Sequence, residues 1–190
     1  MTRPRLVAIG TSWGGLEALG VLLSGLSPSF RPAVVVVQHR GRSTPDGAMR
    51  HYLTERCALP VVDTEDKEPI EPGTIYLGPP DYHLLVDEGT LSLSLEAPVS
   101  YSRPSVDVLF ETAADSYGPE LVAVVLTGAN SDGSRGVVSV KAAGGRVLVQ
   151  DPEEAEKPDM PTAAIATGAV DEVLDLKGLA RRLNQMDRDR

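Results

Sequence analysis

The sequence predicts an α/β fold of a single domain, with a mainly parallel, doubly wound, Rossmann-like sheet that carries an antiparallel hairpin excursion. Three observations predict it. Short apolar runs of strand length recur along the chain, segments with apolar residues at helical spacing separate them, and residues 68–96 differ in having several short strand-like runs between Pro/Gly turns. A length of 190 residues suits one compact domain, residues 1–190, and we expect its core to span about 5–183.

The first third of the chain alternates between strand-like and helix-like segments. Residues 6–9 are an apolar run that ends in Gly-Thr-Ser-Trp-Gly-Gly, which is typical of a buried strand followed by a tight turn. Residues 16–26 carry apolar side chains at helical spacing before a Ser-Pro stop and predict a helix. Residues 33–37 are a β-branched run without alternation and predict a strand covered on both faces. A helix at 48–57 and a strand at 59–62 follow.

The middle of the chain predicts the antiparallel excursion. Three strand-like runs, at 74–78, 82–86 and 90–96, are joined by Pro/Gly and Asp-Glu-Gly turns. We therefore expect all three runs to pair with one another outside the parallel sheet.

The last part of the chain returns to alternation. Residues 105–118 have helical spacing, and 121–126 form a third fully apolar, strand-like run that ends in Thr-Gly-Ala-Asn-Ser-Asp-Gly. Residues 136–145 predict a helix that stops at two glycines. The remaining expected elements are a strand at 146–150, a short helix at 162–168, a strand near 169–174 and a closing helix at 176–185.

Composition excludes several classes of protein. The formal net charge of −9 and the pI near 4.8 argue against nucleic acid or an anionic membrane as the main partner, since both require clustered positive charge. The N-terminal apolar run is too short for a signal peptide, and no stretch approaches the length of a membrane span. The lone cysteine, Cys57, forbids an internal disulfide and fits a reducing compartment, so we expect a cytoplasmic protein in which Cys57 is a small buried hydrophobe.

Three polar side chains stand at the predicted carboxyl ends of separate strands. Ser12 lies in a G-x-S-x-G turn after the first strand, His39 ends the second, and Asp132 follows the strand at 121–126. In an open parallel sheet these ends form the binding edge. A serine hydroxyl needs an imidazole to take its proton, and the imidazole needs a carboxylate to fix its tautomer. The sequence therefore predicts a serine hydrolase with the triad Ser12, His39 and Asp132.

Each of the three is a weak signal by itself, because a small-residue turn, a structural histidine or an Asp in a turn is common. The helix start after Ser12 leaves backbone N–H groups free to stabilise an oxyanion. The other histidines are weaker candidates: His51 suits a helix surface and His83 a packing role in the hairpin. Three separated histidines and one cysteine predict no metal site, and we expect no cofactor.

Two related classes fit less well. A dinucleotide-binding module needs Gly where Ser12 stands and an acidic residue where the second strand ends in Gln38-His39. A common α/β-hydrolase orders its triad Ser, Asp/Glu, His, whereas this chain has Ser, His, Asp.

Five blocks of sequence together resemble the catalytic domain of the CheB chemotaxis receptor methylesterases: IGTSWGGLEAL, VVVVQH, YSRPSVDVLFETAADSYG, VVLTGANSDG and DMPTAAIATGAVDEVL. The resemblance spans nearly the whole chain. It implies hydrolysis of glutamyl methyl esters on methylated chemoreceptors with release of methanol, and in some members deamidation of glutamine. It also implies that Ser12 is the nucleophile, His39 the base and Asp132 the triad aspartate.

The sequence departs from the family pattern beside these residues. Trp13 stands where the family usually has Thr, Ala129 where a Met contributes to the oxyanion hole, and Asn130 where Gly is usual. The loop at 40–47 also differs. Arg103, in the RPSVD stretch, is a candidate to shape the cleft or bind acidic neighbours of the substrate. These changes keep open a retargeted esterase or a non-catalytic binding domain of the same fold.

Most members of the family carry an N-terminal receiver domain that blocks the cleft until it is phosphorylated. This chain starts almost directly at the first expected strand. We therefore expect no built-in phosphorylation control, which leaves room for a separate regulator.

Overall fold

The computed structural model describes residues 5–39, 47–87, 89–99 and 101–188. Within them one sheet contains strands β1 (Leu6–Thr11), β2 (Ala33–Gln38), β3 (Val61–Asp63), β5 (Ile75–Leu77), β8 (Leu121–Val125), β9 (Arg146–Gln150) and β10 (Glu172–Leu174). Their order is β10-β9-β8-β1-β2-β5-β3, and every neighbouring pair is parallel. The predicted α/β class with a parallel sheet is therefore confirmed.

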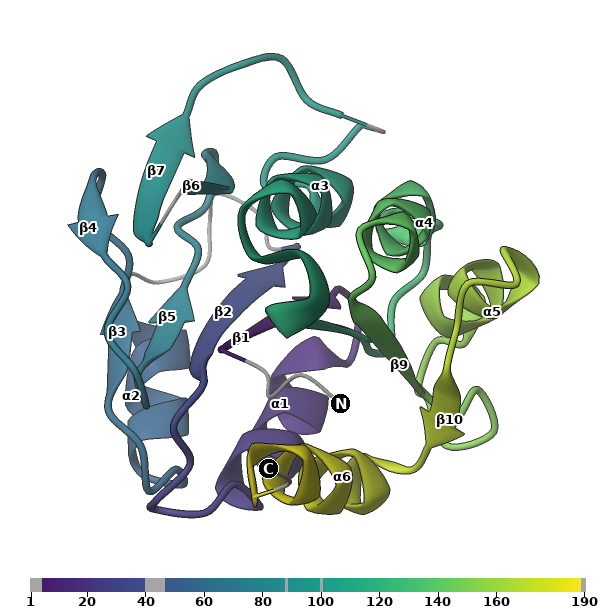
Figure 1. Ribbon diagram of the computed structural model, residues 1–190, viewed down its shortest axis with the longest axis horizontal. Coiled ribbons are helices and arrows are strands. Elements are labelled where there is room, and N and C mark those ends of the chain that lie inside the picture. The colour runs from purple at the N-terminus through teal and green to yellow at the C-terminus, as the bar shows by residue number, and fades with distance from the viewer. Residues whose placement is uncertain (1–4, 40–46, 88, 100, 189–190) are drawn as a thin grey trace.

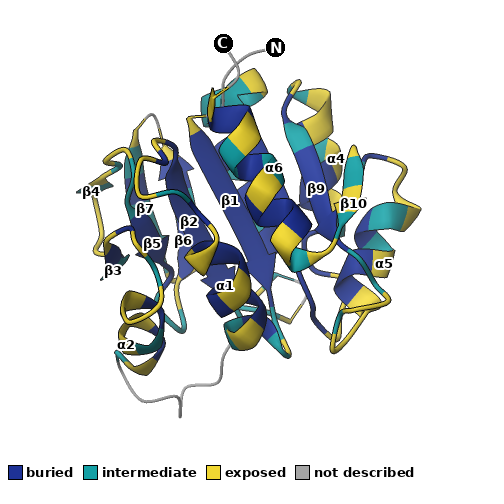
Figure 2. Cartoon of the chain, turned by 90° about the horizontal axis from the view of Figure 1, so that it is seen from below, coloured by how far each residue is buried: buried dark blue, intermediate teal, exposed yellow. Residues whose placement is uncertain are grey.

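Two helical layers enclose this sheet (Figures 1 and 2). The helices are α1 (Gly15–Ser24), α2 (Ala48–Thr54), α3 (Val106–Tyr117), α4 (Ser134–Ala142), α5 (Asp159–Ala166) and α6 (Leu176–Arg188), with a 3₁₀ turn at Gly118–Glu120. Helices α1, α2 and α6 cover one face, and α3, α4 and α5 cover the other. None of the described helices combines the length and apolar character that crossing a membrane requires.

The apolar runs of the sequence correspond to strands with two buried faces. In β1, Val7 and Ile9 pack with the α1 side, whereas Leu6 and Ala8 pack with the α3 side. All four side chains are fully buried. A strand covered in this way has no polar face, which explains why these runs do not alternate.

Residues 74–78 correct one expectation. Their pattern predicts a strand of the antiparallel excursion, but β5 lies in the main sheet between β2 and β3, parallel to both. All three residues of β5 are buried. The nearby Pro/Gly turns suggested a hairpin, whereas burial on both faces makes this run a parallel strand.

The excursion itself is a second, three-stranded antiparallel sheet of β4 (Glu68–Pro69), β7 (Thr90–Ser94) and β6 (His83–Asp87). It is fastened to α3, where Thr112 Oγ1 accepts the Val86 N–H at 3.1 Å and Ser116 Oγ donates to Val86 O at 3.1 Å. The excursion thereby fixes α3 against the sheet.

Strand order sets the location of the site. The chain leaves β1 through α1 to β2 on one side, and later returns through α3 to β8 on the other side of β1. Such a reversal leaves a crevice at the carboxyl ends of the central strands, where open α/β sheets bind ligands. The ends of β1, β2 and β8 therefore meet where Ser12, His39 and Asp132 follow.

Candidate active site

The loop that carries Ser12 is tied to the end of β8. The Ser12 N–H and Thr11 Oγ1 both donate to Thr127 O, at 3.0 and 2.9 Å, and Thr127 Oγ1 donates to Trp13 O at 2.9 Å. Gly14 turns the chain into α1 with φ of 77°, a left-handed conformation that side-chain-bearing residues rarely adopt. These bonds hold Ser12 at the start of the helix.

His39 is placed beside Ser12 by the register of the sheet. Thr11 pairs with Gln38 in the last register position of β1 and β2, and the His39 N–H donates to Thr11 O at 3.0 Å. The residues that follow these two, Ser12 and His39, are therefore adjacent at the carboxyl edge.

His39 and Asp132 form a close pair. His39 Nε2 lies 2.8 Å from Asp132 Oδ2, with the His39 side chain 13% exposed and the Asp132 side chain 1% exposed. An ionised carboxylate only accepts hydrogen bonds, so Nε2 carries the proton. In the neutral imidazole the lone pair is then on Nδ1, which is the nitrogen that can act as a base.

The N-terminus of α3 holds the Asp132 carboxylate. Oδ2 also accepts the Val106 N–H at 2.7 Å, and Oδ1 accepts the Asp107 N–H at 3.0 Å and Ser105 Oγ–H at 2.9 Å. Burial is the largest single influence and opposes ionisation, but the hydrogen bonds from His39, Asp107 and Val106 together hold the pKa of Asp132 below its ordinary value. Asp132 is therefore an anion at neutral pH.

Ser105 belongs to this network although its sequence pattern does not predict it. Its side chain makes no cap bond to α3 and donates to Asp132 instead. The buried His83 supports it: the Ser105 N–H donates to His83 Nδ1 at 3.3 Å, and His83 Nε2 donates to Ala97 O at 3.1 Å. The only sequence signal was a serine directly before a helical pattern, which more often marks an N-cap.

Two backbone N–H groups beside Ser12 are candidates for an oxyanion hole. In the described part of the chain, neither the Trp13 nor the Ala129 N–H donates to a protein acceptor. Gly128 brings Ala129 close to Ser12, because a Cβ built on Gly128 would lie only 2.8 Å from Ser12 Cβ. The oxyanion roles of Trp13 and Ala129 stay predictions.

The Trp13 indole lies on the surface, next in sequence to Ser12. The residue is 61% exposed, and its Nε1–H donates to Glu156 Oε1 at 2.7 Å. Glu156 belongs to the loop before α5. The indole is thus anchored at one end and leaves much of its ring open to a substrate.

Asn130 contacts both members of the His39–Asp132 pair. Its Oδ1 accepts the Asp132 N–H at 3.0 Å, and its Nδ2 lies 3.1 Å from His39 Nδ1. The sequence marked Asn130 only as a departure from the family pattern, because a contact with His39 depends on how two distant loops meet.

Arg103 has a structural role. Its Nη1 donates to Leu95 O and Glu96 O, both at 3.0 Å, and so ties the segment after β7 to the approach to α3. A role in binding substrate stays a prediction. Among the described residues no group of three or more His, Cys, Asp or Glu could hold a metal ion. The loop at 40–46 lies outside the described residues.

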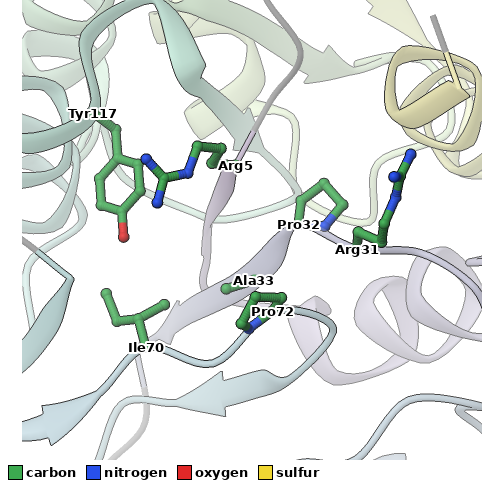
Figure 3. Close-up of a pocket in the computed structure, with 7 residues that line it drawn as sticks. All are labelled: Arg5, Arg31, Pro32, Ala33, Ile70, Pro72 and Tyr117. Carbon is green, nitrogen blue, oxygen red and sulfur yellow. The ribbon is translucent and has the colours of Figure 1, made fainter. Parts of the chain in front are cut away.

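A separate hollow of about 280 Å³ lies at the opposite edge of the sheet (Figure 3). Arg5 and Arg31, which precede β1 and β2, line it together with Tyr117. Arg5 pairs with Glu120 at 3.3 Å, and Arg31 pairs with Asp187 at 3.5 Å. Both cations therefore already have protein partners, and the hollow contains none of the predicted site residues.

Comparisons with known proteins identify the relatives of this chain. A relative from Leptospira interrogans is 42% identical over 184 residues, which cover 96% of this chain and 95% of the relative. "Protein-glutamate methylesterase/protein-glutamine glutaminase 4" of Myxococcus xanthus is 42% identical over 183 residues, covering 96% of this chain and 52% of the relative.

The fold is also similar to that of a solved methylesterase domain. The crystal structure of the Thermotoga maritima CheB methylesterase catalytic domain superposes with a TM-score of 0.90 at 31% identity, covering 97% of this chain and 100% of that one. The sequence profile of the CheB methylesterase family matches residues 7–183. The chain therefore belongs to the CheB methylesterase family of carboxylic ester hydrolases.

Proposed function

We propose that this chain hydrolyses glutamyl methyl esters on a methylated chemoreceptor, releasing methanol and regenerating glutamate, with Ser12 as nucleophile. The observation that carries the proposal is the 2.8 Å pair of His39 and Asp132 at the strand ends beside Ser12. The names of the relatives support the substrate class.

The acylation step uses the free nitrogen of His39. Ser12 Oγ attacks the ester carbonyl carbon while His39 Nδ1 takes the Ser12 proton, and Asp132 stabilises the imidazolium that results. The tetrahedral intermediate then collapses. The bond from carbon to the methoxy oxygen breaks, His39 gives its proton to that oxygen, and methanol leaves an acyl-Ser12.

Deacylation reverses the roles. His39 Nδ1 takes a proton from water, whose oxygen attacks the acyl carbon, and the bond to Ser12 Oγ breaks as Ser12 regains a proton. The product is the glutamate side chain. With a glutamine side chain the same steps release ammonia in place of methanol, which agrees with the double name of the relatives.

The negative oxygen of the intermediate needs donors that are already in place. The N–H groups of Trp13 and Ala129 are suited to this, because they flank Ser12 and have no acceptor within the described residues. Removing one such donor typically costs about 10²–10³ in kcat. Because both donors are backbone groups, the change from Met to Ala at position 129 retains the donor.

The expected partner is a protein. The exposed Trp13 ring, next to Ser12 in the chain, offers an apolar surface against which the backbone of a receptor segment can pack. We place the activity in the cytoplasm, in keeping with a single unpaired cysteine.

The test is methanol release from a methylated receptor fragment, comparing wild type with Ser12→Ala. We expect release by the wild type and none above background by the variant. Cys57→Ala is the matched control, because it removes the other candidate nucleophile and should retain the wild-type rate. Hydrolysis of activated esters without release from the receptor would mean a retargeted esterase. Absence of hydrolysis of both the receptor fragment and the activated esters would reject the enzymatic proposal.

A further inference from the structure

The base nitrogen of His39 is already occupied. A neutral imidazole has one proton-bearing nitrogen and one with a single lone pair. Nε2 is engaged by Asp132 at 2.8 Å, and Nδ1 is 3.1 Å from Asn130 Nδ2. Ser12 Oγ has no protein hydrogen-bond partner within the described residues. The lone pair that should accept the Ser12 proton therefore faces an amide.

The orientation of the Asn130 amide is fixed by its other end. Oδ1 accepts the Asp132 N–H at 3.0 Å, in a turn that side chains of Asn commonly form with the residue two positions on. A backbone N–H can only donate, so the atom that faces it must be the oxygen. The NH₂ group is then the one that faces His39, and it donates to Nδ1.

We propose that Asn130 is a positioning residue that holds the base of the free enzyme in a resting state. The proposal rests on the proposed function, since it takes His39 as the base for Ser12. Donation from Asn130 and donation from the Ser12 hydroxyl compete for one lone pair. The Asn130 amide must therefore leave Nδ1 before Ser12 can be deprotonated.

The surroundings of Asn130 permit this release. Asn130 is exposed, and together with Pro158 and Thr162 it lines an open hollow of about 410 Å³ on the side of α5. When the amide turns away from His39, its N–H groups reach water there. The backbone carbonyls of a bound protein substrate offer acceptors of the same kind, so release is coupled to substrate binding. A free enzyme with a resting base has low reactivity toward small esters.

Two variants of Asn130 separate its two contacts. Asn130→Ser keeps a short oxygen that accepts the Asp132 N–H in a similar turn, but its hydroxyl is too short to reach His39. Asn130→Ala removes both contacts. Ser131→Ala is the matched control: the neighbouring side chain is exposed and makes no hydrogen bond to a described residue.

The probe is a small phosphonofluoridate. Ser12 Oγ forms a bond to phosphorus, the P–F bond breaks with departure of fluoride, and the Ser12 proton goes to His39. The second-order rate of adduct formation is followed by mass spectrometry. We expect Asn130→Ser to react about fivefold faster than wild type, the factor that corresponds to one net hydrogen bond. Asn130→Ala should also react faster, Ser131→Ala should match wild type, and Ser12→Ala should form no adduct.

A second readout does not need catalysis. In the Ser12→Ala background the ¹⁵N resonance of His39 Nδ1 reports whether that nitrogen accepts a hydrogen bond. We expect Asn130→Ser to shift the His39 Nδ1 resonance toward the chemical shift of an imidazole nitrogen that accepts no hydrogen bond from the protein. An unchanged His39 Nδ1 chemical shift in Asn130→Ser would overturn the inference, whatever the rates of adduct formation are.

The outcomes separate this inference from the proposed function. A Ser12-dependent reaction that Asn130→Ser leaves unchanged or slows would overturn the resting-state role and retain the hydrolase. Absence of adduct in the wild type and in both Asn130 variants would overturn the resting-state role and the hydrolase proposal alike, because freeing His39 Nδ1 would then not activate Ser12.

Discussion

At Asp132 one carboxylate receives four hydrogen bonds, from His39 Nε2, Ser105 Oγ and the N–H groups of Val106 and Asp107. Each oxygen takes two, so its acceptor capacity is nearly filled. The carboxylate is held in one position and in its ionised form, and its hydrogen bond with His39 orients the imidazole ring. These hydrogen bonds explain how a buried charge is retained beside the His39 ring.

Replacing Asp132 by Asn should abolish most of the activity without unfolding the protein. An amide presents an NH₂ group where His39 needs an acceptor, which favours the wrong tautomer, and a loss of about 10⁴ in kcat is expected. Methanol release measures it. Asp107→Asn is the control from the same helical turn. The pKa of Asp107 is raised mainly by burial, and an amide oxygen still accepts the Gly136 N–H, so this variant should stay active. Equal losses in the two variants would contradict a specific role for Asp132.

Cys57 should be a slow thiol. Burial raises its pKa to about 11, against a smaller opposing effect of Arg56. At pH 8 roughly one thiol in a thousand is then ionised, so iodoacetamide should react about 100-fold more slowly than with an ordinary cysteine. Alkylation followed by mass spectrometry checks this, with the guanidinium-unfolded chain as the reference. Rapid labelling of the folded protein would show that Cys57 is more accessible than the structure indicates.

At the scale of elements, α3 is the part of the fold that the site depends on most. Its first turn donates to Asp132, and its later residues Thr112 and Ser116 bind Val86 of the antiparallel sheet. The small second sheet therefore supports the proposed site indirectly, because it fixes the helix whose N-terminus holds the carboxylate.

Ser105→Ala should slow the reaction without affecting substrate binding. It removes one of the four donors to Asp132, a loss of about 1 kcal/mol or about fivefold in kcat, with KM unchanged. Ser105→Thr retains a hydroxyl and should restore most of the rate. Steady-state kinetics on the methylated fragment measure both. A change confined to KM would argue that Ser105 acts on substrate binding.

Gly128→Ala should damage the junction of β8, the Ser12 loop and α5. A Cβ there would collide with Met160 Sδ and lie 2.8 Å from Ser12 Cβ. The Met160 side chain can move aside, but Ser12 is held by its own backbone bonds. We expect a stability loss of about 1–3 kcal/mol and a larger loss of activity. Denaturant unfolding and ester hydrolysis measure the two effects, and an unchanged kcat would contradict the close approach.

At the scale of the whole molecule, the site should make the fold sensitive to acid. The folded-state pKa of Asp132 is lowered, so its contribution to stability is present above the unfolded value of about 3.9 and is lost as pH falls through the folded value. The raised pKa of Asp107 acts in the opposite direction, as its ionisation above about 3.9 destabilises the fold.

The difference in unfolding free energy between wild type and Asp132→Asn isolates the first effect, because Asp107 is present in both. We expect wild type to be the more stable at pH 6–7 and the difference to shrink as the pH falls below about 4. Denaturant unfolding across this range measures it. A difference that is constant with pH would mean that the charge of Asp132 does not contribute to stability.

The sequence by itself determined the α/β class, nearly every strand and helix, and the convergence of Ser12, His39 and Asp132 on one edge. Residues buried on both faces leave a pattern in the chain, and the carboxyl ends of parallel strands meet at one edge wherever they lie in the sequence. Local pattern did not place β5 in the parallel sheet, because the turn residues on both sides of its three buried residues are also typical of a hairpin. Local pattern also did not give the start of α5, which begins at Asp159 and includes Pro161 in its first turn.

Only the tertiary structure decided which groups touch the His39–Asp132 pair. Ser105 and Asn130 lie 27 and 2 positions from Asp132, and Asn130 lies 91 from His39. A hydrogen bond requires its atoms to be within about 3 Å, and that proximity is set by how α3 and the loop after β8 pack against the strand ends. Composition and periodicity record which side chains are buried, but they do not record distances between segments remote in the chain.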